Sequence, residues 1–223
     1  MLAWAKSLLG HVPAYVGLQK VIGADRLRYR CIEDLKLQPG ERVLDVGCGP
    51  AYYFERLGDV KYTGFDTDER YIAWANGRWG DRADFRCEIL TEDHLASLPK
   101  MDAVMLLGLL HHLSDEDSSR LLRIVAGALA PGGRVISVDT CFEPTQGKIS
   151  HWMSANDRGE YVRRPEQFVD LARRTFGDVD GEVLNETTRI PSSHWLMRMR
   201  TPVAAAPATG AVATERVDGI ASA

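Results

Sequence analysis

The chain has 223 residues, of which 45% are hydrophobic and 26% charged, and its formal net charge is −4. This balance is typical of a globular protein. The longest uninterrupted apolar run, residues 103–110, is too short to cross a bilayer, so we expect no membrane span. Because a protein held by nucleic-acid phosphates is usually basic, we also expect no nucleic-acid partner.

The four cysteines show no C-x-x-C spacing; they are Cys31, Cys48, Cys87 and Cys141. Zinc and cysteine-ligated iron–sulfur sites are typically built on such pairs, so we expect no metal site. The spacing also gives no sign of a disulfide framework, which favours a reducing, cytoplasmic location.

Three parts follow one another along the chain. Residues 1–36 have an amphipathic helical pattern, with Leu27, Cys31 and Leu35 at four-residue spacing, and we predict a helical cover there. Residues 37–200 are predicted to form one α/β domain. Residues 201–223 contain eight alanines, two prolines and no aromatic residue, and so we expect a disordered tail.

Strand and helix patterns alternate through the middle part. We predict buried strands at 41–46, 62–66, 83–89, 101–107 and 134–139, with two further strands near 179–187 and 193–200. Helices are predicted at 68–76, 115–129 and 165–176, and Ser114 stands where it can cap the second of them. Alternating strands and helices imply a parallel sheet with helices on both faces. The last two strands are joined too closely for a helical crossover, so we expect an antiparallel pair at one edge.

A glycine-rich loop follows the first strand, in the segment Asp45-Val46-Gly47-Cys48-Gly49-Pro50. Glycines between a strand and the next helix let the backbone pass close to a ligand. Tyr52 occupies the position where a pyrophosphate-binding loop needs a small residue, which favours a nucleoside without phosphate. Asp66, at the end of the second strand, can accept hydrogen bonds from a ribose diol. The alternatives are a glycine turn that serves packing alone and a solvated Asp66.

Four segments together resemble the class I S-adenosylmethionine-dependent methyltransferases: residues 45–50, Gly64-Phe65-Asp66, Leu109-Leu110-His111-His112-Leu113 and Leu129-Ala130-Pro131-Gly132-Gly133. The resemblance covers residues 38–140. It implies a Rossmann-like, doubly wound α/β fold with a mostly parallel seven-stranded sheet, a reversed last strand and helices on both faces. It also implies S-adenosylmethionine as the cofactor. Tyr52 departs from the family, many members of which have a smaller residue there.

The resemblance assigns roles to individual residues. Gly47 and Gly49 would let the backbone approach the cofactor, Asp45 would orient the loop, and Asp66 would hold the ribose hydroxyls. The full set of expected cofactor contacts is Asp45, Gly47, Cys48, Gly49, Asp66, Thr67, Glu88, Ile89, Leu107 and Gly108.

The expected acceptor is a small molecule, enclosed by the N-terminal helices and by the long segment that follows the fifth strand. Aromatic and polar side chains on these covers are typical of a small-molecule site; we select Tyr15, Gln19, His151, Trp152, Tyr161 and Arg163. His112 is the candidate proton acceptor, because histidine titrates near neutral pH. Its alternative is a purely structural role, which is also what we expect of His111.

Two other functions remain open at this point. A nicotinamide-dependent oxidoreductase would also use a glycine loop and an acid at the next strand end, although Tyr52 argues against it. A protein with this fold that binds a partner without catalysis would need no catalytic base, and the sequence shows no unmistakable one. The patterns leave the acceptor and the oligomeric state undetermined.

Overall fold

The structure is a computed structural model that describes residues 12–157, 159–185 and 188–203. Its centre is a seven-stranded sheet in the order β3-β2-β1-β4-β5-β7-β6. Six strands are parallel to one another, and β7 runs antiparallel to both β5 and β6. The strands are β1 (Arg42–Val46), β2 (Lys61–Asp66), β3 (Ala83–Cys87), β4 (Met101–Leu107), β5 (Leu129–Thr140), β6 (Phe176–Leu184) and β7 (His194–Pro202).

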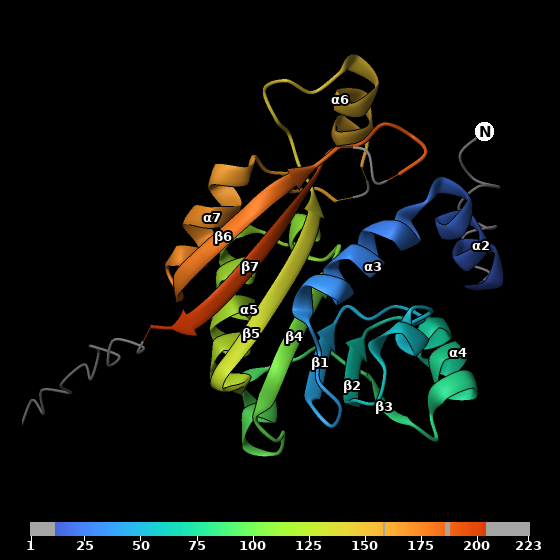
Figure 1. Cartoon of the computed structure of the whole chain (residues 1–223), viewed down its shortest axis with the longest axis vertical. Helices are drawn as coiled ribbons and strands as arrows, with labels where there is room; N and C mark the ends of the chain where they lie inside the picture. The colour runs from blue at the N-terminus through green and yellow to red at the C-terminus, as the bar shows by residue number, and fades with distance from the viewer. Residues whose placement is uncertain (1–11, 158, 186–187, 204–223) are drawn as a thin grey trace, which may run out of the picture.

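Helices cover both faces of this sheet (Figure 1). In the described residues the α-helices are α2 (Val12–Ile22), α3 (Ala24–Leu35), α4 (Glu69–Trp79), α5 (Asp115–Ala128), α6 (Lys148–Ala155) and α7 (Pro165–Arg173). Three short 3₁₀ helices accompany them: η1 (Phe54–Leu57), η2 (Glu92–Ala96) and η3 (Leu110–His112). The predicted fold class, with its mostly parallel sheet, reversed last strand and extra N-terminal helices, is therefore confirmed.

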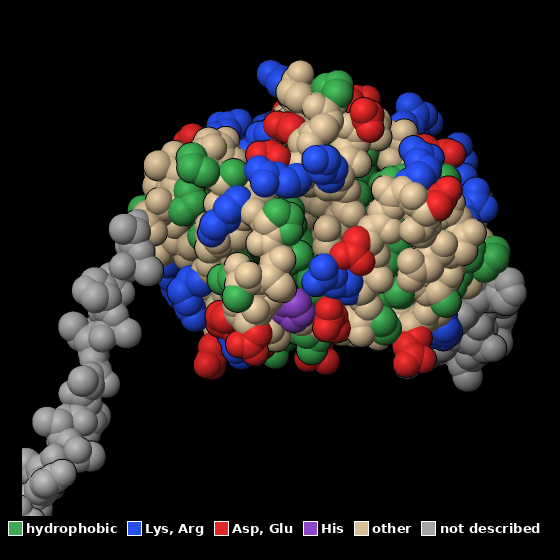
Figure 2. Space-filling view, turned by 90° about the horizontal axis from the view of Figure 1, so that it is seen from below, with side chains coloured by type: hydrophobic (Ala, Val, Ile, Leu, Met, Phe, Trp, Pro, Cys, Tyr) green, Lys and Arg blue, Asp and Glu red, His purple; other side chains and the backbone are tan. Residues whose placement is uncertain are grey.

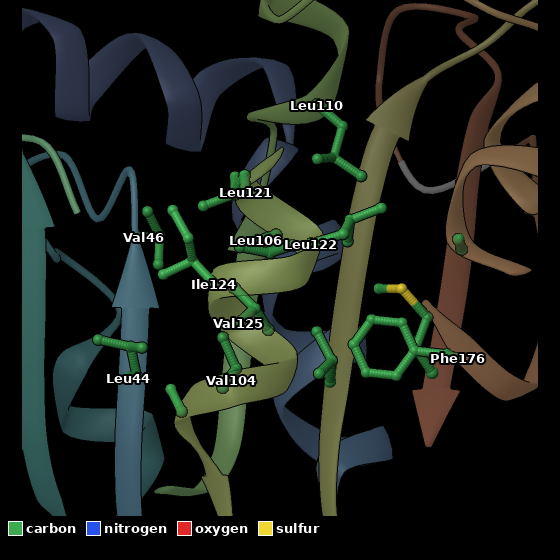
Figure 3. Close-up of a cluster of buried hydrophobic side chains, with 14 of the residues drawn as sticks. Leu44, Val46, Val104, Leu106, Leu110, Leu121, Leu122, Ile124, Val125 and Phe176 are labelled. Atoms are coloured by element: carbon green, nitrogen blue, oxygen red, sulfur yellow. The ribbon is translucent and has the colours of Figure 1, made fainter. Parts of the chain in front are cut away.

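Two hydrophobic clusters fill the space between the sheet and its helices. One lies under α5 and α7, where Leu122 and Phe168 are almost completely buried. Figure 3 shows α5 side chains such as Leu121 and Val125 against Leu44 of β1 and Val104 of β4. The other cluster lies under α3, η1 and α4. Because β4 is covered on both faces, its sequence is a nearly continuous apolar run rather than an alternating one.

The structure corrects three predicted boundaries. The helix expected to run to residue 176 ends at Arg173, and Phe176 instead begins β6, paired with Pro202. Phe176 is fully buried, as its apolar side chain predicts, but it belongs to β6 and not to the helix. The third strand ends at Cys87 rather than at residue 89, and β5 begins at Leu129 rather than at residue 134.

The first two residues of the expected tail belong to the sheet instead. Thr201 and Pro202 continue β7, and the Val203 amide donates a hydrogen bond to the Thr175 carbonyl oxygen at 2.9 Å. Pairing with β6 supplies this order, and composition alone does not reveal a pairing partner. Residues 204–223, and residues 1–11 of the predicted helical cover, lie outside the described residues.

The predicted cap of α5 is present and gives a first testable prediction. Ser114 Oγ accepts a hydrogen bond from the Asp117 amide at 3.1 Å. We expect Ser114→Ala to lower the free energy of unfolding by about 1 kcal/mol, because a helix-terminal amide loses its acceptor. Urea unfolding measures this change. Ser114→Thr keeps the hydroxyl and should restore most of the loss; equal losses in both variants would contradict the capping role.

Candidate functional site

The loop after β1 presents open backbone at the carboxyl end of the sheet. Gly47 and Gly49 both have positive φ, at 74° and 53°, a region that favours glycine. A Cβ added to Gly49 would meet no atom within 4 Å, whereas one on Gly47 would lie 3.2 Å from Leu109 Cδ1. The loop is also fixed to the next strand, because the amides of Gly47 and Cys48 donate to the Phe65 carbonyl oxygen. Gly49 therefore exposes a rigid stretch of backbone that has room for a ligand.

Asp66 ends β2 beside this loop. Its Oδ2 accepts a hydrogen bond from the Gly49 amide at 2.8 Å, and its Oδ1 accepts one from the Asp68 amide at 2.9 Å. These two bonds fix the carboxylate in the wall of the cavity described below. Each carboxylate oxygen can accept a further hydrogen bond, so Asp66 can still receive two donors from a ligand.

Asp45 lies beneath the loop rather than in the cavity wall. Its side chain is fully buried, and Oδ2 accepts hydrogen bonds from the hydroxyls of Tyr53 and Tyr62, both at 2.7 Å. Burial raises the pKa of Asp45 to about 6, although these hydrogen bonds oppose the shift. The other oxygen, Oδ1, has no hydrogen-bond partner among the described residues. A buried polar atom without a partner is costly, which makes Oδ1 a ready acceptor for an additional donor.

A cavity of about 600 Å³ extends from this loop, past the carboxyl ends of β4 and β5, to the N-terminal helices and α6. Ligands of open α/β sheets bind at this edge of the sheet, where the strand order reverses. Here the reversal lies between β1 and β4. The lining residues used below are Leu18, Gln19, Arg28, Gly49, Asp66, Leu109, His112, Thr140, Met153, Asn156, Asp157, Ile190 and His194.

The structure brings most of the expected cofactor residues together. Gly47, Cys48, Gly49, Asp66, Leu107 and Gly108 all line the cavity. Thr67, Glu88 and Ile89 are not among the lining residues. Glu88 instead lies 3.3 Å from His94 Nε2, and the Ile89 side chain is 69% exposed. Their expected contacts with the cofactor therefore remain predictions.

The expected acceptor residues divide into two groups. Tyr15, Gln19 and His112 line the cavity. His151, Trp152 and Tyr161 do not; His151 packs against Phe142, and Trp152 is exposed on α6.

Arg163 has a different position from the one expected for a ligand-binding residue. It is buried outside the cavity, where its guanidinium donates to the carbonyl oxygens of Leu110 and Leu113, at 2.8 and 2.7 Å. It also donates to Asp115 Oδ1 at 2.8 Å. These hydrogen bonds join the segment that precedes α7 to the η3 turn. The Arg163 guanidinium therefore stabilises the fold at this point and does not face the cavity.

His111 joins three segments at the inner end of the cavity. Its Nδ1 lies 2.9 Å from Asp139 Oδ1 on β5, and its Nε2 lies 3.2 Å from Asp157 Oδ1 just after α6. Asp157 also accepts hydrogen bonds from Thr140 Oγ1 and from the Gly159 amide. We call His111, Asp139 and Asp157 the histidine clasp.

The clasp is charged at neutral pH. Burial alone would lower the pKa of His111, but the hydrogen bonds to Asp139 and Asp157 have the larger, opposite effect and raise it to about 9. Burial alone would raise the pKa of Asp157, but the hydrogen bonds from His111 and from the Gly159 amide outweigh it and lower the pKa to about 2. His111 is therefore an imidazolium between two carboxylates and cannot serve as a proton acceptor near pH 7.

Two cavity residues were missed at the sequence level. Arg28 is the only arginine or lysine among the described lining residues; it donates to Gln19 Oε1 at 3.1 Å and lies over the Tyr52 ring. It falls four residues after buried Ala24 and three before Cys31, so helical periodicity places it on the inner face of α3. Arg30, two residues further along α3, does not line the cavity and pairs with Glu182 at 3.4 Å.

His194 is the second missed residue, and no local pattern marks it. Burial, and then the charge of His111, lower its pKa to about 4, so its imidazole is neutral at pH 7. Its Nδ1 is buried and has no hydrogen-bond partner among the described residues. Only the pairing of Thr140 in β5 with His194 in β7 brings it to the clasp.

Residues 43–133 match the family model of a methyltransferase domain. The 27-O-demethylrifamycin SV methyltransferase of Amycolatopsis mediterranei is 35% identical over 128 residues, which cover 54% of this chain and 46% of that protein. A probable tRNA methyltransferase 9B of Mus musculus is 31% identical over 104 residues, 44% of this chain and 22% of that protein. The chain thus spans less than half the length of these two curated relatives.

Among solved structures, a SAM-dependent methyltransferase from Archaeoglobus fulgidus has a TM-score of 0.64 to this chain at 17% identity. The match covers 83% of this chain and 99% of that one, and at this identity it concerns the fold. Separately, no helix in the described part of the chain is long and apolar enough to cross a membrane. Within the same part, no group of three or more His, Cys, Asp or Glu side chains is arranged to hold a metal ion.

The charged state of the clasp leads to a pH-dependent stability. Because folding raises the pKa of His111, its contribution is complete below about pH 6.5 and is lost as the pH rises through about 9. Asp157 has the opposite shift, so its contribution is complete above about pH 4 and is lost as the pH falls towards about 2. The clasp should therefore stabilise the fold most between about pH 4 and 6.5.

We expect the free energy of unfolding to decline by an amount on the order of 3 kcal/mol between pH 6.5 and 9. Asp157→Asn should make this decline smaller and lower the His111 pKa, which NMR titration of the imidazole protons measures directly. Asp170→Asn, which removes an exposed carboxylate on α7, is the control and should leave both quantities unchanged. An unchanged His111 pKa in Asp157→Asn would disprove the clasp.

Proposed function

We propose that this chain, which carries a class I S-adenosylmethionine-dependent methyltransferase domain, methylates a small molecule bound in the cavity at the carboxyl ends of β1, β2, β4 and β5. The observation that carries the proposal is the pairing of Gly49 with Asp66. An open, positive-φ glycine and a carboxylate with spare acceptor capacity meet in one cavity wall. The family match favours this activity over the nicotinamide-dependent alternative.

The residues of the cavity fit the cofactor of this family. The backbone at Gly47 and Gly49 leaves room for a nucleoside, and Asp66 can receive both ribose hydroxyls. Arg28, at the α3 side of the cavity, is suited to a carboxylate, while the unpartnered Asp45 Oδ1 can accept a hydrogen bond from a ligand amine or a bridging water. When bound, S-adenosylmethionine supplies an activated methyl group on a sulfonium that leaves as a neutral thioether.

The protein's own task is then to align the acceptor, exclude water and remove a proton where the acceptor is a hydroxyl. Leu109 and Met153 give the cavity apolar walls that keep water out. Asn156, Asp157 and Thr140 offer hydrogen bonds that orient a polar group. Since His111 is already protonated, His112 remains our candidate proton acceptor, with the neutral His194 as the second.

A small-molecule acceptor is favoured over a nucleic acid. The net charge is −4. Figure 2 shows the molecule from below in the view of Figure 1, the end that carries the amino ends of the parallel strands rather than the cavity, and acidic and basic side chains are interspersed on it. A nucleic-acid site needs a basic surface that neutralises phosphates. One of the relatives above is a probable tRNA methyltransferase, so transfer to tRNA is the specific alternative to test.

The glycine loop supplies the sharpest test of cofactor binding. Gly49→Ala places a methyl group where a Cβ meets no protein atom, so the variant should fold with a strain of about 1–2 kcal/mol. The same methyl group would occupy space needed by the cofactor, and we expect S-adenosylhomocysteine to bind at least about tenfold more weakly by calorimetry.

Gly40→Ala is the matched control. Gly40 also has positive φ, at 82°, and open space around its Cβ, but it lies in the turn before β1, at the opposite end of the strand. It should show a similar strain and bind S-adenosylhomocysteine like the parent chain. Equal binding by the two variants would mean that the loop serves packing alone.

The proton acceptor is tested on an acceptor identified by a mass shift of one methyl group after incubation with labelled donor. His112→Ala should lower kcat by about 10²–10⁴-fold if this imidazole takes the proton, with little change in KM. His194→Ala tests the second candidate by the same measurement. Full turnover by His112→Ala would remove that residue from the chemistry, and methyl transfer to tRNA instead of to a metabolite would contradict the small-molecule proposal.

A further inference from the structure

Exposed apolar side chains gather around the mouth of the cavity. Eight large hydrophobic residues are exposed in the described part of the chain, and five of them lie on α2, α6 and the segment 188–192 that leads into β7. We call these five the apolar rim: Leu18, Val21, Ile149, Trp152 and Ile190. Val21, Ile149 and Trp152 are each more than 60% exposed. Such a concentration of exposed apolar surface marks an interaction site.

The apolar rim is continuous with the cavity. Leu18 and Ile190 line the cavity themselves while remaining 41% and 40% exposed. On α6, Ile149 stands four residues before Met153, so the two share a helix face, and Met153 lines the cavity. Asn156, which follows the helix, also lines the cavity, and its side-chain amide donates to the Trp152 carbonyl oxygen at 2.8 Å.

The third segment of the rim is fixed to α2. The Arg189 amide donates to the Ile22 carbonyl oxygen at 2.7 Å, and Arg189 Nη1 donates to the Val21 carbonyl oxygen at 3.2 Å. Figure 1 shows α6 and the segment that enters β7 together beyond the carboxyl ends of the parallel strands, with α2 at the side. Two of the three rim segments, α2 and residues 188–192, are therefore held together at the cavity.

The inner end of the cavity is polar, and its mouth adds exposed apolar side chains. Thr140, Asp157 and His194 supply polar groups at the inner end, whereas Leu18 and Ile190 line the mouth together with Gln19, Thr188 and Ser192. A volume of about 600 Å³ is within the range that encloses a single drug-sized ligand. If the nucleoside cofactor takes the part beside the glycine loop, little enclosed volume is left for a second molecule.

We propose that the acceptor is an amphiphilic small molecule, which inserts its reacting polar group among Thr140, Asp157 and His194 and rests an apolar body on the apolar rim. This inference rests on the proposed function. It accounts for both halves of the site: the polar inner end orients one hydroxyl or amine, and the rim removes from water a hydrophobic body too large for the cavity. The rim thereby selects acceptors by apolar area.

The test measures binding of a series of 4-alkylphenols, from 4-ethylphenol to 4-hexylphenol, to the full chain with S-adenosylhomocysteine bound. Calorimetry should give a Kd that falls by about twofold to fourfold for each added methylene, as expected for apolar surface leaving water. The double variant Ile149→Ser/Trp152→Ser should lose most of this chain-length dependence. It should still bind S-adenosylhomocysteine like the parent chain.

Two exposed valines provide a matched pair. Val21→Ser alters the rim, and Val203→Ser makes the same change at an exposed valine after β7, outside the cavity. Only Val21→Ser should weaken 4-hexylphenol binding. Circular dichroism and thermal unfolding establish that each variant is folded before binding is compared.

The outcomes separate this inference from the proposed function. Failure of the parent chain to bind S-adenosylhomocysteine overturns the proposed function itself. Normal S-adenosylhomocysteine binding with no chain-length dependence, or a dependence that the rim variants leave intact, overturns only the amphiphilic acceptor. A dimeric parent chain that becomes monomeric in the double variant, measured by sedimentation, would instead assign the rim to a second copy of this chain.

Discussion

The imidazolium of His111 between Asp139 and Asp157 determines the shape of the candidate site. It links the turn after β4, the end of β5 and the segment after α6, which are otherwise separate parts of the chain. Buried charges are tolerated only when they are paired, and losing one partner of such a group costs far more than losing a surface ion pair. The clasp therefore keeps the inner wall of the cavity in one arrangement. Arg163 stabilises the same turn by donating hydrogen bonds to the carbonyl oxygens of Leu110 and Leu113.

Charge is distributed along the cavity in a way that suits two different ligands. Arg28 stands at the α3 side, near the glycine loop, and Asp66 stands at the end of β2. At the other end, the imidazolium of His111 and the carboxylate of Asp157 lie beside the neutral His194. A carboxylate-bearing nucleoside fits the first arrangement, whereas the second, with its paired charges, suits a polar group.

The low pKa of His194 follows from the same arrangement. A neutral imidazole is favoured because burial and the nearby imidazolium both oppose a second positive charge. His111 and His194 thus differ in charge at pH 7: His111 is cationic and His194 is neutral. The difference arises from their carboxylate contacts, since only His111 is in hydrogen-bond range of Asp139 and Asp157.

Much of the fold was predictable from local patterns. The strand Met101–Leu107, the cap at Ser114 and the glycine loop with Asp66 were all identified from residue periodicity or turn chemistry, because these features depend on a few neighbouring residues. The end of α7 and the extension of β7 to Pro202 were misjudged. Both depend on pairing between β6 and β7, which composition does not encode.

The sequence by itself determined the α/β architecture and one wall of the cavity, where the glycine loop and Asp66 follow their strands directly. Only the tertiary structure decided the opposite wall. Arg163 reaches carbonyl groups 50 and 53 residues away, and His194 meets the clasp through a strand pair. Such contacts arise when distant segments pack together, and a side chain's role there depends on which partners burial leaves within hydrogen-bond range. No local pattern carries that information.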